Sequence, residues 1–233
     1  KVWSKEYDLN GRLINETGEK DDNGEYKYDN LLDYKYVDIE YDTYEWRNKN
    51  SSPGSAMEKV HIGTKMCRFA QFPEGKAIMP SILEELLKAR KDTRKQIPNE
   101  TDEFKKNVLD ARQLSIKVTA NSMYGQTGAK TSTFYEMDCA ASTTAIGRKL
   151  LTYARRVIEE AYNDIVVPTK DYGDVKVKAE YVYGDTDSVF FKFNPTELDG
   201  TKIIGQKALE ITIELSQQAG KLATMFLKTP HDL

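Results

Sequence analysis

The sequence has 233 residues, 30% of them charged, and a formal net charge of −3. A chain of this length can bury a substantial core and suits one large domain or two small ones. The near-neutral balance lacks the bulk positive charge that is typical of a nucleic-acid binder. Two isolated cysteines argue against structural zinc and a disulfide framework, so reduced thiols are expected, and no apolar run is long enough to cross a membrane.

Residues 1–65 are polar, acidic and rich in tyrosine. Turn signals occur at residues 10–11, 23–24 and 52–54, where Asn-Gly or Ser-Pro-Gly punctuates the chain. The short mixed stretches between them, such as residues 36–41, predict only marginal strands or loop.

Residues 80–125 predict two helices. Pro80 suits a first helical turn, and the leucines that follow it have helical spacing. A break is predicted at residues 96–101, with Asn99 or Thr101 as the N-cap of the second helix. Two helices joined by so short a turn are expected to pack antiparallel.

The first of these helices carries a local excess of positive charge. Between Lys88 and Lys95 the sequence has five basic residues and one acidic residue. Arg90 and Arg94 lie one turn apart, and guanidinium groups bond phosphate oxygens in a fixed fork, so the pair can grip a triphosphate. The alternative is an ordinary solvated helix face.

The second helix carries Lys117, Asn121 and Tyr124 at positions i, i+4 and i+7, which share one face. A cation, an amide and an aromatic hydroxyl in line suit a ligand with a polyphosphate tail, a polar middle and a flat base. Because the helices are antiparallel, we expect Arg90 and Arg94 to face Lys117 across the pair. A solvated face is again the alternative.

Segments 179–183 and 189–193 are rich in β-branched and aromatic residues and predict a β-hairpin, with Asp185 and Asp187 at its tip. Two carboxylates on a stiff support favour half of a Mg²⁺ site. An Asp-rich turn is the alternative. An EF-hand loop is excluded, because its central glycine and final glutamate are missing.

Helices are also predicted before and after the hairpin, at about residues 138–162 and 203–227. The predicted elements are therefore mixed, with helices and antiparallel strands both well represented.

Three runs, in this order, resemble family B DNA polymerases, most closely the delta-type replicative enzymes and their relatives in large DNA viruses. The first is residues 82–91, in the fingers. The second is residues 112–125, which contain the family's Lys-x-x-x-Asn-Ser-x-Tyr-Gly motif. The third is Tyr-Gly-Asp-Thr-Asp-Ser at 183–188, the palm hairpin. The resemblance extends over about residues 67–193 and is weaker before them.

The resemblance implies an α+β fold: a polymerase palm, which is an antiparallel sheet with helices packed on it, plus an antiparallel two-helix fingers subdomain. Residues 1–79 are then expected to be a variable insert leading from the palm, 80–127 the fingers helices, and 128–233 the palm with the catalytic hairpin. The implied activity is template-directed nucleotidyl transfer from dNTPs to a primer 3′-hydroxyl, with two Mg²⁺ ions.

The resemblance also assigns roles to residues. Asp187 matches an essential metal-binding carboxylate, and Asp185 matches the first aspartate of the same catalytic pair. Arg94 stands where many members carry lysine, and Gly125 is expected to allow a close approach or a kink. The residues that match the incoming-nucleotide site are Arg90, Arg94, Lys117, Asn121 and Tyr124, the last of them beside the nascent base pair.

Several family motifs do not occur in this sequence. The second essential metal-binding aspartate belongs to an Asp-x-x-Ser-Leu-Tyr-Pro run, which is missing, as are the proofreading motifs and the thumb-side Lys-Lys-Arg-Tyr segment. We therefore expect an internal fragment that is inactive alone. The expected partners are primer-template DNA, dNTPs and, through a C-terminal region outside this sequence, a sliding clamp. The expected location is intracellular, at the host nucleus or a cytoplasmic replication site.

Two other functions fit parts of the sequence. A catalytically dead palm could serve as a structural module, but the intact Asp185, Asp187, Arg90 and Lys117 argue against it. Another palm nucleotidyltransferase, such as a reverse transcriptase, also carries paired hairpin aspartates. The motif at 117–125 argues against that function, because it belongs to family B.

Overall fold

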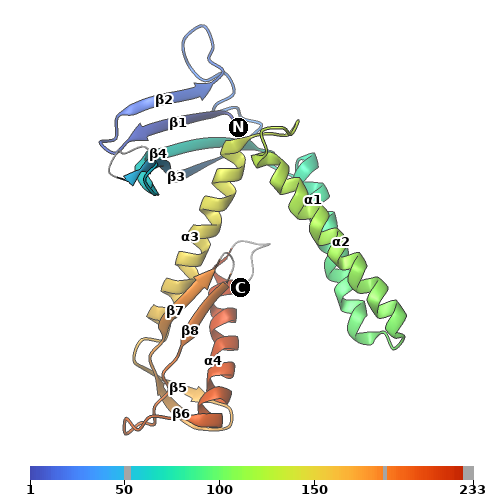
Figure 1. Cartoon of the computed structure of the whole chain (residues 1–233), viewed down its shortest axis with the longest axis vertical. Coiled ribbons are helices and arrows are strands. Elements are labelled where there is room, and N and C mark those ends of the chain that lie inside the picture. The colour runs from blue at the N-terminus through green and yellow to red at the C-terminus, as the bar shows by residue number, and fades with distance from the viewer. Residues whose placement is uncertain (50–53, 186–187, 228–233) are drawn as a thin grey trace. The chain divides into compact units, whose positions relative to one another are not determined.

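The structure is a computed structural model that describes residues 1–49, 54–185 and 188–227. It divides into two compact units, Lys1–Ala145 and Ile146–Leu233, which are described separately. Both contain helices and antiparallel strands, so the predicted α+β class is confirmed (Figure 1). Among the described residues, no helix combines the length and the apolar character that a membrane span requires.

The first unit opens with a four-stranded antiparallel sheet in the order β2-β1-β4-β3. Its strands are β1 (Trp3–Asp8), β2 (Leu13–Gly18), β3 (Lys35–Asn48) and β4 (Met57–Gln71). The prediction of marginal strands or loop for residues 1–65 is wrong, because β3 has 14 residues and β4 has 15.

Cross-strand pairs explain why such polar strands form. Asp38 lies opposite Arg68, whose guanidinium donates to it at 2.6 Å and to Asp29 at 2.9 Å. Opposite charges facing each other stabilise an antiparallel pair, but the partners are far apart in the sequence. At Gly63 a Cβ would lie 1.9 Å from the carbonyl oxygen of Tyr7, so only glycine lets β1 approach β4 there.

The first unit continues with two helices. They are α1 (Ile78–Gln96) and α2 (Glu103–Gly128), joined by the 3₁₀ turn η2 (Ile97–Asn99). The two helices lie side by side, as expected for a short connection (Figure 1). The predicted pair and its break are confirmed to within a few residues.

The N-cap of α2 differs from the prediction. Asp102 caps the helix, and its carboxylate accepts from the backbone N–H groups of Phe104 at 2.9 Å and Lys105 at 3.3 Å. A cap must stand immediately before the helix with an extended backbone, which Asp102 does. Asn99 instead donates to a carbonyl in the last turn of α1. The prediction of Asn99 or Thr101 was therefore wrong.

Both helices bury side chains at alternating steps of three and four residues, the heptad pattern of a coiled-coil seam. Arg90 and Gln113 are polar members of this seam. The less exposed positions that follow this pattern are Met79, Leu83, Leu86, Arg90, Thr93 and Ile97 on one side, and Lys106, Leu109, Gln113, Ile116, Ala120 and Met123 on the other.

The second unit contains two hairpins, each a two-stranded antiparallel sheet. The first pairs β5 (Ile165–Thr169) with β6 (Gly173–Val177), and the second pairs β7 (Glu180–Asp185) with β8 (Ser188–Lys192). The predicted hairpin at 179–193 is confirmed.

Helix α3 (Met137–Ala161) begins in the first unit and continues into the second, where α4 (Gly205–Met225) joins it. Both helices were predicted within two residues of these bounds. The hydrophobic core of the second unit lies between them and the strands. Its buried members include Ile158, Tyr162, Val175, Val177, Phe193, Ile211 and Leu215.

Candidate active site

The acidic hairpin ends with Asp185 paired opposite Ser188. Thr186 and Asp187 lie outside the described residues. Gly184 lies in a crowded position, because a Cβ there would lie 2.6 Å from the Tyr181 hydroxyl and 3.1 Å from the Ser188 carbonyl oxygen. The glycine of the motif therefore lets the two strands approach closely beside the aspartate.

The hairpin has one face toward its own unit and one face exposed. Tyr181 and Phe191 are half-buried and meet edge to face at 5.9 Å. On the opposite side, Tyr183 is 56% exposed and Phe190 is 57% exposed. Strand alternation places Asp185 on the same side as Tyr183, so the carboxylate belongs to the exposed face.

Helix α3 anchors the base of the hairpin. The Glu159 carboxylate accepts from the backbone N–H of Tyr181 at 3.3 Å, and Arg155 lies 4.4 Å from the Tyr181 ring centroid. Arg155 also donates to Glu159 at 2.9 Å. These contacts fix β7 at Tyr181, four residues before Asp185, and so provide the stiff support that a metal-binding carboxylate needs.

The donor chemistry of the hairpin fits a hard divalent cation. Asp185 offers carboxylate oxygens, which suit Mg²⁺, and the soft or nitrogen ligands that favour zinc are not part of the hairpin sequence. Within residues 1–49, 54–185 and 188–227, no group of three or more potential metal ligands is found. Asp187 lies outside these ranges.

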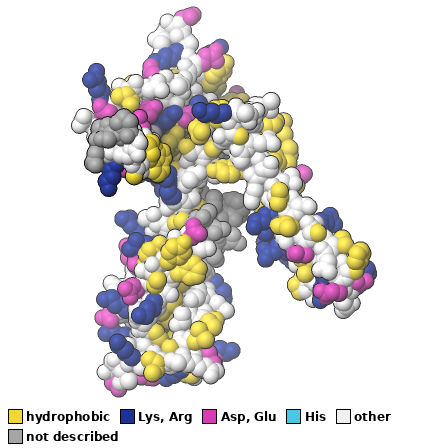
Figure 2. Space-filling view, viewed as in Figure 1, with side chains coloured by type: hydrophobic (Ala, Val, Ile, Leu, Met, Phe, Trp, Pro, Cys, Tyr) yellow, Lys and Arg dark blue, Asp and Glu magenta, His cyan; other side chains and the backbone are white. Residues whose placement is uncertain are grey.

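Two cationic residues of α1 line an open hollow of about 350 Å³ between the two helices. Arg90 and Arg94 both contribute to it, so the structure brings these two predicted residues together. Figure 2 shows Lys and Arg side chains at several points along the helix pair. The lining residues are Arg90, Arg94, Ile97, Pro98, Asp110 and Gln113.

Gln113 holds the guanidinium of Arg90 from the opposite helix, and Asp110 in turn holds the Gln113 amide. The Nε of Arg90 donates to Oε1 of Gln113 at 3.3 Å, and the Gln113 amide donates to Asp110 at 3.0 Å. Sequence reasoning assigned no role to either residue, although Gln113 lies within the run 112–125 that carries the family resemblance. The signal that could have found Gln113 is the heptad spacing, which places a polar residue in the seam.

Arg90 does not face Lys117 as expected, because its partner on α2 lies one helical turn before Lys117. Arg90 meets Gln113, and Lys117 lies four residues further along α2 and does not line the hollow. The register of an antiparallel pair depends on which seam residues interlock, and spacing along one helix does not set it. Lys117 and Asn121 are exposed on α2, as a ligand-binding face requires.

Tyr124 is anchored by its hydroxyl and open at its ring. The hydroxyl donates to the Ala140 carbonyl oxygen at 3.2 Å and pairs with the Thr144 hydroxyl at 3.0 Å, both on α3. Its side chain is still 41% exposed. A ring held at one end and open on its surface can serve as a platform for a flat ligand.

No contact among the described residues requires a glycine at position 125. It lies inside α2 with no positive φ, and a Cβ there would meet nothing within 4 Å. The expected close approach or kink is therefore not made by the described residues.

A second polar cluster, which sequence reasoning missed, surrounds Asp138 at the start of α3. This residue is 5% exposed and forms ion pairs with Lys1 at 2.6 Å and Lys65 at 2.7 Å. The Tyr41 hydroxyl donates to it at 3.1 Å. Burial alone would raise the pKa of Asp138, but the hydrogen bonds from Lys1 and Lys65 outweigh burial and lower it to about 2. No local pattern links these residues.

A family model described as DNA polymerase family B matches residues 34–222. The matched range contains the helix pair, Asp185 and Asp187, and the chain belongs to the family B DNA polymerases. The resemblance recognised in the sequence is thereby confirmed. The match begins inside the predicted insert of residues 1–79, and the predicted domain boundaries stay predictions.

Similar proteins come from large DNA viruses and from eukaryotes. The chain is 60% identical over 230 residues to a DNA polymerase of Phaeocystis pouchetii virus, covering 99% of this chain and 22% of that protein. It is 34% identical over 252 residues to a DNA polymerase of Pyramimonas orientalis virus, covering 89% of this chain and 19% of that protein. It is 37% identical over 158 residues to the DNA polymerase delta catalytic subunit of Dictyostelium discoideum, covering 68% of this chain and 13% of that protein.

Proposed function

We propose that this chain supplies the fingers and most of the palm of a DNA-directed DNA polymerase. The observation that carries the proposal is the family match over residues 34–222, combined with a hairpin that ends in Asp185 on its exposed face. The chain spans only 22% of the viral relative's length, so the rest of the active enzyme comes from outside this sequence.

Asp185 and Asp187 are proposed to be the catalytic carboxylates that bind Mg²⁺. When bound, two such ions align a primer 3′-hydroxyl with the α-phosphate of a dNTP and neutralise developing charge. The role of this chain is to hold the carboxylate oxygens on a rigid hairpin. Glu159 fixes the base of that hairpin. The other essential aspartate is expected from a strand that this sequence does not encode.

The helix pair is proposed to bind the incoming dNTP. Arg90, Arg94 and Lys117 would contact the triphosphate through charge-assisted hydrogen bonds. Gln113 holds the Arg90 guanidinium, which reduces the cost of ordering that long side chain on binding. Asn121 would contact the polar middle of the nucleotide. The Tyr124 ring, with its hydroxyl fixed on α3, would pack beside the nascent base pair.

The partners proposed for the whole polymerase are primer-template DNA, dNTPs and a sliding clamp that binds a C-terminal region. The proposed location is intracellular, in the host nucleus or at a cytoplasmic replication site. The related proteins support this setting, because they are named as viral DNA polymerases and as delta catalytic subunits.

The test is Asp187→Ala in a polymerase that contains this chain. A metal ligand stabilises charge chiefly in the transition state, so kcat should fall at least ~10³-fold while dNTP affinity stays within about tenfold. Asp185→Ala should also be damaging. Single-turnover incorporation measures both quantities.

The matched control is Asp174→Ala, which removes an exposed carboxylate from β6, the neighbouring hairpin of the same unit. Its incorporation rate should equal that of the parent. Near-normal incorporation by Asp187→Ala would refute the metal assignment.

A further inference from the structure

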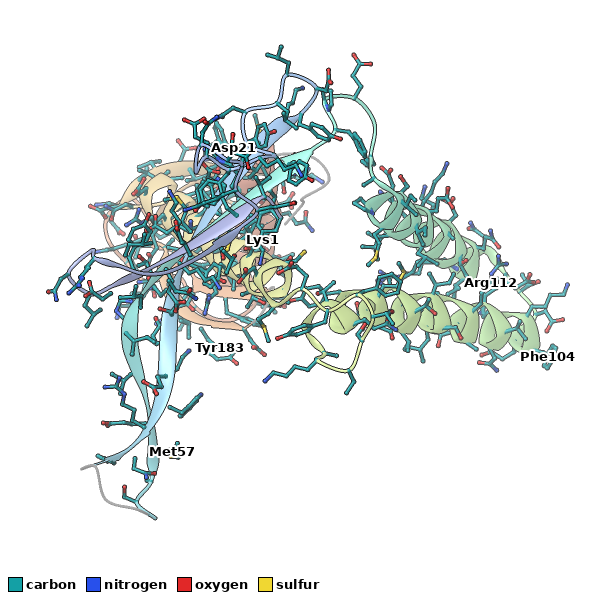
Figure 3. The ribbon with its side chains drawn as sticks, turned by 90° about the horizontal axis from the view of Figure 1, so that it is seen from above. Lys1, Asp21, Met57, Phe104, Arg112 and Tyr183 are labelled. Atoms are coloured by element: carbon teal, nitrogen blue, oxygen red, sulfur yellow. The ribbon has the colours of Figure 1, made fainter. Side chains whose placement is uncertain are left out.

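The outer part of the β3-β4 hairpin is a two-stranded ribbon. Here the ribbon means residues 44–48 of β3 and 57–61 of β4, which pair from Tyr44 opposite His61 to Asn48 opposite Met57. Among the described strands, β1 accompanies β4 only from Gly63 to Arg68. The ribbon therefore continues beyond the four-stranded sheet, and Figure 3 shows Met57 at its far end.

The two faces of the ribbon differ in chemistry. Strand alternation places six residues on one face, called here the aromatic face, and none of them is acidic: Tyr44, Trp46, Asn48, Met57, Lys59 and His61. The opposite face carries Glu45, Arg47, Glu58 and Val60, and Arg47 is paired with Glu45 at 2.8 Å. At the base of the aromatic face stands Asp42, 3.7 Å from His61.

The aromatic face exposes large side chains to solvent. Trp46 is 61% exposed, Met57 is 54% exposed and Tyr44 is 41% exposed. The other tryptophan of the chain, Trp3, is 5% exposed, donates its Nε1–H to Asp29 and stacks on Tyr26. A contiguous exposed patch of this kind marks an interaction site more often than a plain surface.

Tyr44 holds the cation of this face in place. The Lys59 ammonium lies 4.1 Å from the Tyr44 ring centroid, and the His61 ring lies 5.3 Å from the same centroid. Lys59 is the direct cross-strand partner of Trp46. A fixed ammonium therefore stands beside an open indole, and the ammonium still has N–H donors for an anion.

We propose that the aromatic face of the ribbon binds single-stranded DNA, with a base stacked on Trp46 and a neighbouring phosphate paired with Lys59. Aromatic side chains interleaved with cations are the general means of binding single strands without sequence preference. A phosphate backbone complements a face whose ribbon residues carry no carboxylate, and Asp42 confines the strand to the outer part. This binding site goes beyond the proposed function. Only the choice of DNA over RNA as the ligand rests on the proposed function.

The test is titration of the 233-residue chain with a short oligo(dT) at low salt, read by tryptophan fluorescence. Because Trp3 is buried, emission changes report on Trp46, and binding at the basic helix α1 is not mistaken for binding here. We expect quenching of Trp46 by the oligonucleotide. Binding to the Trp46→Ala variant, followed by the anisotropy of a labelled oligonucleotide, should be weaker by roughly 5- to 140-fold, the range for one lost base stack.

The chain offers a matched pair of charge variants. Lys59→Gln removes a cation from the aromatic face, and Arg47→Gln removes one from the opposite face of the same ribbon. Lys59→Gln should weaken oligo(dT) binding and reduce the slope of log Kd against log salt by about 0.7, as expected for one lost phosphate contact. Arg47→Gln should leave both unchanged.

Equal effects of the two charge variants would overturn the proposal, because they would indicate nonspecific attraction. So would oligo(dT) binding that leaves Trp46 emission unchanged, or self-association of the chain that Trp46→Ala abolishes. Circular dichroism should show that Trp46→Ala folds normally, since the side chain is exposed. Failure of this binding test leaves the polymerase proposal intact, because Asp187→Ala tests incorporation and should not change oligo(dT) binding at the ribbon.

Discussion

Arg90 and Lys117 stand on different helices, yet both are proposed to hold one triphosphate. In a polymerase that contains this chain, Arg90→Ala and Lys117→Ala should each lower kcat/KM. The loss of transition-state stabilisation should be about 2–4 kcal/mol for each variant, as expected for a charge-assisted bond at the reacting group. The double variant should lose less than the sum, because the two residues share a ligand. Single-nucleotide incorporation kinetics measures this.

Lys91→Ala is the control, since Lys91 neighbours Arg90 but is exposed away from the seam. Its kcat/KM should stay near that of the parent. Additive losses in the double variant, or losses confined to DNA binding, would mean that these cations contact the template backbone or only solvent.

Gly125 is a helix residue whose glycine nothing in the described chain requires. Gly125→Ala should therefore raise the free energy of unfolding of this chain by about 0.5–1 kcal/mol, because alanine loses less backbone entropy in a helix. In the polymerase, we propose that substrate approaches this position closely, so the added methyl should lower kcat/KM at least about tenfold. Urea unfolding and incorporation kinetics measure the two effects.

Gly147→Ala provides the comparison, since Gly147 lies in α3 and its Cβ would also meet nothing within 4 Å. It should stabilise the chain to a similar degree and leave kcat/KM unchanged. If Gly125→Ala also left kcat/KM unchanged, no substrate would approach that position.

At the scale of elements, the buried carboxylate of Asp138 joins the strand bearing Lys65, and Lys1 beside β1, to the first turn of α3. Its folded pKa of about 2 is below the ordinary value of 3.8. A depressed pKa stabilises the fold above the unfolded pKa, and this contribution is lost as pH falls through the folded pKa. Stability should thus fall by on the order of 2 kcal/mol between about pH 4 and pH 2.

Asp138→Asn should remove that acid dependence and destabilise the chain by about 3 kcal/mol at pH 7, because Lys1 and Lys65 lose their buried partner. Glu136→Gln is the control: Glu136 also pairs with Lys1, at 3.1 Å, but its side chain is 41% exposed. That variant should cost less than about 1 kcal/mol. Chemical denaturation at several pH values measures both, and equal costs would contradict the role given to Asp138.

At the scale of the whole molecule, the 233-residue chain alone should not polymerise DNA. The proposed two-metal chemistry needs carboxylates from two strands, and only the hairpin pair is recognisable in this sequence. Among the described strands, β7 and β8 pair only with each other, which leaves edges for the strand expected from outside. Primer extension with Mg²⁺ and with Mn²⁺ should give no product.

Template-dependent extension by the purified chain, abolished by Asp187→Ala, would show that a complete site exists here. Contamination by a host enzyme is controlled by the same variant, since its preparation would carry the same contaminant and retain the product.

The sequence by itself determined the helices, the acidic hairpin and the family. The heptad spacing of α1 and α2 and the apolar segments around Asp185 arise from neighbours in the chain, so local periodicity was sufficient. The motif residues Lys117, Asn121 and Tyr124 likewise share a helix face because of their spacing alone. Only the identities of the residues were needed for these conclusions.

Only the tertiary structure decided what depends on pairing between distant segments. The register of the helix pair set Arg90 against Gln113 and placed Lys117 one turn away. The long strands β3 and β4 bring together residues far apart in sequence, such as Asp38 and Arg68, and Asp138 pairs with Lys1 and Lys65. Such contacts depend on how elements pack, and a one-residue change of register would alter them all, so no local pattern can encode them.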